Sequence, residues 1–191
     1  TWKLPEPFMV MATQNPIEQE GTYQLPEAQL DRFLMHVLVS YPNAEEEYQI
    51  LQLGRTEAMQ QVRHEKNPVE VVVKQSDIIA ARQEVLALYM GQPVEHYIVQ
   101  LIMATRHPER YGARLGGQIA FGASPRATLA LDRCARAHAW LAGRDFVSPE
   151  DVQAIAFDVL RHRIILTFEA EADGLTRQHL IQELLNVVAV P

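Results

Sequence analysis

Short apolar runs and polar stretches alternate along the first forty residues. Residues 8–12 (FMVMA) and 33–39 (FLMHVLV) are apolar runs of strand length, typical of strands buried on both faces of a parallel sheet. Between them, Pro26 precedes the segment 27–30 and favours the first turn of a short helix there. Strand, helix and strand in this order predict a parallel crossover unit.

A longer helix is predicted after Asn43. This residue is a good N-cap, Glu46 stands at the third helical position, and the acids of the first turn suit the helix dipole. We expect this helix to end at Gly54, because the stretch that follows is polar and contains an Asn-Pro pair. The pattern predicts an α/β part in residues 1–55, a linker at 56–75 and a second domain at 76–191.

From residue 76 onward the apolar residues recur at steps of three and four, which is the spacing of one face of an α-helix. Prolines that favour a first helical turn stand at positions 93, 125 and 149, the last two directly after a serine. The pattern predicts an all-helical bundle whose five helices begin near residues 76, 93, 125, 149 and 175. The basic residues Arg161 to Arg163 fall in the last turn of one of them, where the helix dipole accounts for them.

Composition and charge narrow the possible functions. The chain has 191 residues, 48% of them apolar, which is enough to bury a core. Its formal net charge of −7 opposes a wide basic surface, so we expect no nucleic-acid partner. The single Cys134 cannot form an internal disulfide and indicates a reducing compartment, which favours the cytoplasm.

The ends and the apolar runs of the chain carry two further expectations. No apolar run approaches the roughly 20 residues of a membrane helix, so no membrane span is expected. The chain starts with Thr-Trp-Lys-Leu-Pro rather than with a methionine, and we expect it to be a piece of a longer protein.

Asn15 follows the first predicted strand. Ligands of open parallel sheets gather beyond the carboxyl ends of the strands, and a carboxamide can both donate and accept a hydrogen bond. Asn15 is therefore suited to hold a water molecule in line with a phosphate. Taken alone, Asn15-Pro16 is more often a simple turn dipeptide.

Two arginines stand at predicted helix ends. Arg32 follows the short helix, where the dipole favours a cation by about 0.3–1 kcal/mol and a structural role suffices. Arg126 lies in a first helical turn, where the same dipole disfavours a cation unless an anion binds there too. Glycines at 112, 116, 117 and 122 indicate a flexible approach to that turn. The alternative for Arg126 is a side chain that folds back onto Asp132 or points to solvent.

The histidines do not indicate a metal site. His107, His138 and His162 have no metal-ligand spacing with Cys, Asp or Glu, so none is assigned to a metal. No Ser-His-Asp or nucleophile-elbow pattern occurs in the sequence either.

Five stretches occur in a fixed order that is similar to one ATPase family. Residues 11–21 (MATQNPIEQEG), 25–33 (LPEAQLDRF) and 122–127 (GASPRA) are followed by 144–149 (RDFVSP) and 159–163 (VLRHR). In these stretches the sequence resembles the MoxR family of AAA+ ATPases over essentially its full length. The Gly-x-x-x-x-Gly-Lys-Ser/Thr phosphate loop and the acidic pair for Mg²⁺ do not occur in it. The chain thus resembles the C-terminal remainder of the ATPase core followed by its helical lid.

The resemblance implies a fold and a role for each candidate residue. The expected fold is an α/β fragment, with two parallel strands of a P-loop NTPase sheet and their helices, followed by an all-α lid. Asn15 would be sensor 1 and orient the attacking water, and Arg32 would be an arginine finger acting on ATP held by the neighbouring subunit. Arg126 would be sensor 2 and contact the phosphates of ATP, in its own subunit or in a neighbour's.

The resemblance also implies cofactors, partners and an activity. ATP and Mg²⁺ would be bound mainly by residues outside this sequence, in a ring that is expected to be a hexamer. Proteins with a von Willebrand factor A domain and client proteins would be its partners, and its action would be chaperone-like. The isolated chain is expected not to hydrolyse ATP. The alternative is a non-enzymatic helical module for protein interaction.

Overall fold

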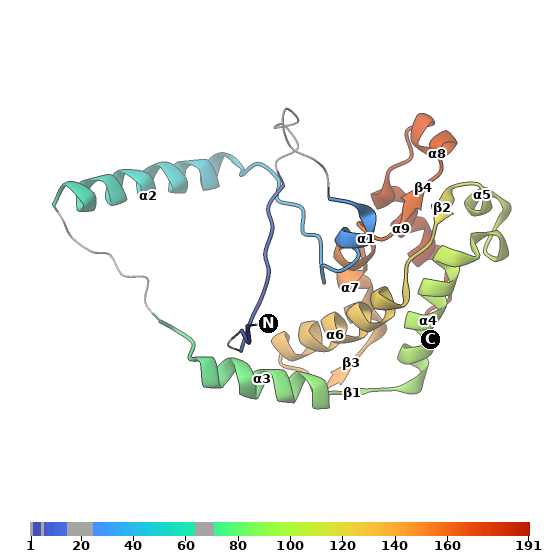
Figure 1. Cartoon of the computed structure of the whole chain (residues 1–191), viewed down its shortest axis with the longest axis horizontal. Helices are drawn as coiled ribbons and strands as arrows, with labels where there is room; N and C mark the ends of the chain where they lie inside the picture. Colours follow the sequence, from blue (N-terminus) through green and yellow to red (C-terminus); the bar gives the residue numbers. More distant parts are fainter. Residues whose placement is uncertain (1, 5, 15–24, 64–70) are drawn as a thin grey trace.

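The computed structural model describes residues 2–4, 6–14, 25–63 and 71–191 (Figure 1). Nine helices and one 3-10 turn occur in these residues: α1 (Glu27–Leu30), α2 (Ala44–Val62), α3 (Gln75–Ala87), α4 (Gln92–Arg106), η1 (Pro108–Arg110), α5 (Ala113–Gly116), α6 (Pro125–Leu141), α7 (Pro149–Leu160), α8 (Phe168–Ala172) and α9 (Arg177–Val187). The described strands are β1 (Tyr89–Met90), β2 (Ile119–Phe121), β3 (Phe146–Val147) and β4 (Ile165–Leu166).

The five helices predicted from residue 76 onward are present as α3, α4, α6, α7 and α9. Their starts follow the local rules. Proline stands in the first turn of α4, α6 and α7, and Ser124 caps α6 by accepting a hydrogen bond from the backbone amide of Arg126. Ser148 and Asp151 form a capping box at the start of α7. These starts were readable because capping is decided by residues a few positions apart.

Helix α2 begins as predicted and ends later. Asn43 accepts hydrogen bonds from the amides of Glu45 and Glu46, and Glu46 accepts one from Asn43 in return. The helix continues past Gly54 to Val62, so the prediction that it ends at Gly54 is wrong. One glycine costs a helix about 1 kcal/mol relative to alanine, and the Arg, Glu, Ala, Met and Gln that follow are good helix formers. The first residues of the predicted linker are therefore helical, and the domain boundaries themselves stay a prediction.

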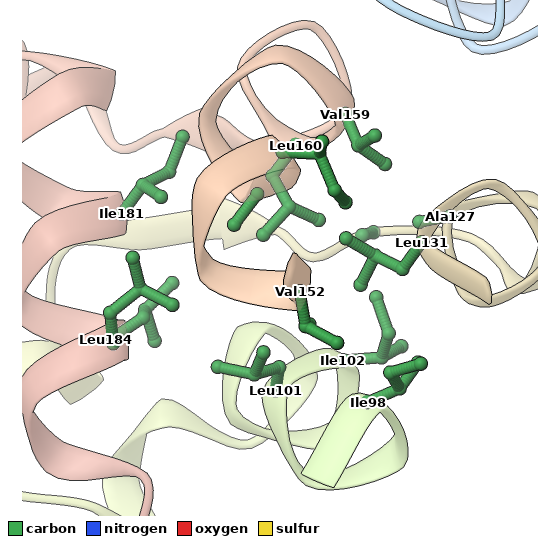
Figure 2. Packing of buried hydrophobic residues seen from close by; sticks show 14 of the residues in the cluster. Ile98, Leu101, Ile102, Ala127, Leu131, Val152, Val159, Leu160, Ile181 and Leu184 are labelled. Atoms are coloured by element: carbon green, nitrogen blue, oxygen red, sulfur yellow. The ribbon is translucent and has the colours of Figure 1, made fainter. Parts of the chain in front are cut away.

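The core lies among α4, α6, α7 and α9, which we call the helical bundle. Figure 2 shows Leu101 and Ile102 of α4 facing Val152 of α7, with Leu131 of α6 beside them. Ile181 and Leu184 of α9 close the other side of α7. The buried apolar residues of the described chain all lie between Met90 and Val188, so the bundle carries the core.

Two small sheets border the bundle. β1 and β3 pair in parallel, with Tyr89 opposite Phe146, and β2 and β4 pair antiparallel, with Ile119 opposite Leu166. Both pairs join segments that are far apart in the sequence. Strands of two or three residues are too short to show a pattern, which is why the sequence did not predict them.

The predicted class, a short parallel pair and helices combined with a helical lid, is confirmed, but the parallel strands are β1 and β3. The strands predicted at 8–12 and 33–39 are not formed: within the described residues, the chain has no strand before Tyr89. Their side chains are largely exposed, as at Met9 and Val39. A strand needs a neighbour for its backbone hydrogen bonds, and none of the described segments supplies one.

Helix α2 lies apart from the bundle (Figure 1), and none of its residues is buried. Helix α3 lies along α6, where Trp140 Nε1 donates a hydrogen bond to Glu84 at 2.9 Å. None of the helices that the structure describes has the length and apolar character needed to cross a bilayer.

Candidate functional site

Three side chains of the bundle region converge on Asp31, the residue that follows α1. Ser124 Oγ donates to the carboxylate, 2.9 Å from each of its oxygens. Arg126 Nη1 donates to Oδ2 at 3.0 Å, and Arg163 Nε donates to Oδ1 at 3.2 Å. The start of α6 and the segment after α7 are thereby joined to the segment 25–33.

Arg163 is the fixed member of this cluster. Its side chain is only 2% exposed. Besides the carboxylate, its guanidinium donates to the backbone carbonyls of Asp31, Phe33, Leu34 and Val159. Burial lowers the pKa of Arg163, and the charge of Asp31 raises it. The ion pair with Asp31 therefore offsets part of the free-energy cost of burying the guanidinium charge. Arg163 thus anchors the chain after α1 to the end of α7.

His162 supports the same segment. Its Nε2 lies 3.1 Å from the carbonyl oxygen of Phe33, and because a carbonyl can only accept, this nitrogen carries the proton. Burial and the neighbouring Arg163 lower the pKa of His162 to about 4, so the ring is neutral at pH 7. A further hydrogen bond runs from the amide of His36 to the carbonyl of Asp158 at 2.8 Å.

The electrostatics of the cluster favour an ionised Asp31. Burial alone raises its pKa, but hydrogen bonds from Arg126 and Ser124 and the charge of Arg163 outweigh burial and lower the pKa below its usual value. One carboxylate faces two guanidinium groups, which leaves the cluster with a net positive charge. A pocket of about 240 Å³ lies beside it, lined by Asp31, Ser124, Arg163 and their neighbours.

Gly122 holds the start of α6 against the end of α4. A Cβ at this position would lie 2.3 Å from the carbonyl oxygen of Thr105, so only glycine allows the approach. The Ala123 amide donates to Thr105 Oγ1 at 3.0 Å, and Arg106 Nε donates to the Ala123 carbonyl at 2.8 Å. The predicted flexible approach therefore does not apply at Gly122, which positions Ser124 and Arg126.

The structure places the predicted site residues in different surroundings. Arg126 is 60% exposed and pairs with Asp31. The alternative contact with Asp132 is wrong, because the Arg126 guanidinium binds Asp31 instead, while Asp132 pairs with Arg136 at 3.0 Å. Arg32 is exposed and has no ion pair among the residues that the structure describes. Asn15 lies outside the described residues. The structure thus brings Arg126 to the residue next to Arg32, and not to Arg32 itself.

Sequence reasoning missed Asp31 and Arg163. The dipole explanation of the basic residues near the end of α7 is wrong for Arg163, since the helix ends at Leu160 and Arg163 is buried against Asp31. Asp31 and Arg163 are 132 residues apart, and no local pattern marks either as a partner. The one available signal was that both lie inside stretches that resemble family signatures.

No group of three or more His, Cys, Asp or Glu that could hold a metal ion occurs in the described part of the chain.

Comparisons with known proteins agree with the fold. The profile of the AAA lid domain matches residues 113–184, and that of the ATPase family associated with various cellular activities (AAA) matches residues 1–35. Chaperone MoxR1 of Mycobacterium tuberculosis is 40% identical over all of this chain and 49% of its own length. Protein MoxR of Paracoccus denitrificans is 33% identical, over 96% of this chain and 56% of its own.

A crystal structure of a candidate ATPase from Cytophaga hutchinsonii superposes with a TM-score of 0.91 at 40% identity, covering 100% of this chain and 56% of that one. The chain therefore belongs to the AAA+ class and combines a segment of the AAA core profile with the AAA lid domain. Within that class, it belongs to the MoxR family. It spans about half the length of the curated relatives that it matches.

Proposed function

We propose that the full-length protein binds and hydrolyses ATP in a ring of subunits and uses the resulting lid movement to remodel other proteins. The observation that carries this proposal is the contact between Arg126 and Asp31. Arg126 lies in the first turn of the lid helix α6, and Asp31 directly precedes the candidate arginine finger Arg32. A change at the nucleotide can thus be transmitted directly from the lid to the segment that acts on a neighbouring subunit.

The residues at hand suit an anionic ligand such as the phosphates of ATP. The guanidinium of Arg126 is exposed and already binds a carboxylate, which is an anion of similar hydrogen-bonding geometry. In this proposal Arg126 is sensor 2 and donates to a phosphate oxygen. When bound, ATP supplies the phosphoanhydride bond whose hydrolysis drives the cycle. In this proposal Mg²⁺ and most contacts of ATP are supplied by residues outside this sequence, since no phosphate loop occurs in it.

Arg32 is proposed to be the arginine finger that acts in trans. It is exposed and stands beside an anchored Asp31, so its charge can reach a neighbouring subunit without breaking an ion pair of the described residues. Such a residue stabilises charge in the transition state of phosphoryl transfer and is worth about 10³–10⁵ in rate. Asn15 is proposed to orient the attacking water as sensor 1.

The partners and the compartment belong to the same proposal. One relative is named as a chaperone, which supports client proteins as the substrates of remodelling. We further propose a hexameric ring, partners with a von Willebrand factor A domain, and a cytoplasmic location. The last of these rests on the single Cys134, which is buried and unpaired.

The decisive experiment replaces Arg32 by alanine in the full-length protein. We expect ATP turnover to fall about 10³-fold or more while nucleotide affinity changes little, because a finger acts on the transition state in the neighbouring site. Steady-state ATPase assays and calorimetry measure the two quantities. Arg133→Ala, an exposed arginine of α6, is the matched control and should leave both unchanged.

Mixing subunits tests the action in trans. Rings assembled from Arg32→Ala and unaltered subunits should lose turnover in proportion to the fraction of interfaces that lack the arginine. An Arg32→Ala protein that loses affinity as strongly as turnover would place the residue in its own subunit's site. A full-length protein with no nucleotide binding at all would leave the non-enzymatic interaction module as the better proposal.

The isolated 191-residue chain should neither bind Mg-ATP tightly nor hydrolyse it, since no phosphate loop occurs in its sequence. Calorimetry with this chain tests that expectation, and micromolar affinity would contradict it.

A further inference from the structure

We propose that Asp31 is a positioning residue that holds Arg126 in the nucleotide-free protein and releases it to the phosphates of a bound nucleotide. The release would link nucleotide binding to the turn that carries Arg32. This inference rests on the proposed function, in which Arg126 contacts ATP.

The first observation is that the two arginines on Asp31 are unequal. Arg163 is 2% exposed and is held by backbone carbonyls as well as by the carboxylate. Arg126 is 60% exposed, and Asp31 is the partner of its guanidinium in the described chain. Asp31 therefore has one permanent cationic partner and one that can exchange.

The second observation is that Asp31 keeps its compensation when Arg126 leaves. Arg163 and the hydroxyl of Ser124 still donate to the carboxylate, so no buried charge is left without a partner. The contact that opens is an exposed ion pair, which is the weak kind. Arg126 donates one hydrogen bond to Asp31, whereas a phosphate carries more charge and can accept two from a guanidinium, so a phosphate competes well for Arg126.

The third observation is the position of Asp31 in the chain. Asp31 is the C-cap residue of α1, and directly after it the amide of Arg32 donates to the Gln29 carbonyl at 3.1 Å. When Arg126 leaves the Asp31 carboxylate, the forces on Asp31 change, and the backbone of the neighbouring Arg32 can shift in response. The position of Arg32 would therefore depend on whether Arg126 binds Asp31 or a phosphate.

The test is Asp31→Asn in the full-length protein, with ATPγS and Mg²⁺ titrated by calorimetry. Removing the competing charge frees Arg126, so the affinity for ATPγS should rise about two- to fivefold, the effect of losing one exposed ion pair. A merely structural role would weaken binding instead. Asp132→Asn removes a charge from the same helix as Arg126 and should leave the affinity unchanged.

A double-mutant cycle completes the test. Arg126→Ala should weaken binding, and in that background Asp31→Asn should no longer tighten it. If Arg126→Ala weakens binding but Asp31→Asn leaves the affinity equal or lower, the release is wrong and the proposed function stands. If Arg126→Ala has no effect, the phosphate contact and the release are both wrong. Asp31→Ser, which also removes the charge, replaces the asparagine variant should that one fail to fold.

Discussion

The helical bundle and the segments before it contain similar apolar side chains, but these are buried in the bundle and exposed in the earlier segments. Leu131 of α6 is completely buried, whereas Leu51 of α2 is half exposed. Both stand in well-formed helices, but only α6 has neighbours on its apolar side within the described chain. An apolar face alone does not bury a helix. The face is removed from water only where another element of the fold packs against it.

The largest expected effect tests this difference directly. Leu131→Ala should lower the free energy of unfolding of the 191-residue chain by about 2–5 kcal/mol, because it leaves a cavity in a packed core. Leu51→Ala should change it by less than about 0.5 kcal/mol. Urea unfolding followed by circular dichroism measures both. Equal losses would show that α2 packs as tightly as the bundle does.

A second test concerns the buried carboxylate of α7. Asp151 is fully buried, and it accepts hydrogen bonds from Arg144 and from the Ser148 amide and lies 2.6 Å from His138 Nδ1. Asp151→Asn should cost about 3 kcal/mol, since it removes one partner of a buried ionic network. Asp132→Asn, in a partly exposed i,i+4 pair, should cost about 1 kcal/mol or less. Similar costs for the two variants would contradict a special role for burial.

The pH dependence of stability sharpens the contrast further. The pKa of His162 is lowered to about 4 in the fold, so the folded state binds the proton less readily than the unfolded chain. The stabilisation is complete above the unfolded value near 6.5 and is lost as the pH falls towards 4, by about 3 kcal/mol. Urea unfolding at pH 7 and pH 4.5 measures it, and His162→Gln should flatten the slope.

At pH values below about 4, Asp151 determines the pH dependence of stability. Burial alone raises its pKa, but hydrogen bonds from Arg144, the Ser148 amide and His138 outweigh burial and hold the pKa well below its usual range. Its contribution is present above the unfolded value near 3.9 and disappears as the pH falls further. Burial also lowers the pKa of His36, so His162→Gln should keep a smaller loss of stability between pH 6.5 and 4.5. A loss as large as that of the unaltered chain would contradict the assignment to His162.

The smallest expected effect compares two helix caps. Thr176 caps α9 in the bundle through a 3.2 Å hydrogen bond from the His179 amide, and Thr176→Ala should lower the unfolding free energy by about 1 kcal/mol. Asn43→Ala should reduce the helical signal of α2 and leave the unfolding of the bundle unchanged. Circular dichroism at 222 nm and urea unfolding separate the two outcomes. A loss of bundle stability in Asn43→Ala would contradict the independence of α2.

Much of the fold was readable because it depends on neighbours in the sequence. Pro125 and Ser124, or Asn43 and Glu46, mark a helix start with residues one to three positions apart, and the structure confirms both starts. The strands predicted at 8–12 and 33–39 failed because a strand is completed by a partner elsewhere. For the same reason the pairing of β1 with β3 went unpredicted.

Part of the candidate site could also be predicted from the sequence, and part could not. The motif stretches drew attention to Arg32 and Arg126, and the comparisons show the family. The partner of Arg126 could not be predicted, because Asp31 lies 95 residues away and only the packing of α6 and α7 brings the two together.

The sequence by itself determined where the helices of the bundle start and which of their faces are apolar, since capping and periodicity are local properties of the chain. The tertiary structure alone decided that Asp31 meets both Arg126 and Arg163, that Gly122 must be glycine, and that His162 stays neutral. Each of these depends on distance, burial and charge between segments that are remote in the sequence, and such quantities exist only once the chain has folded.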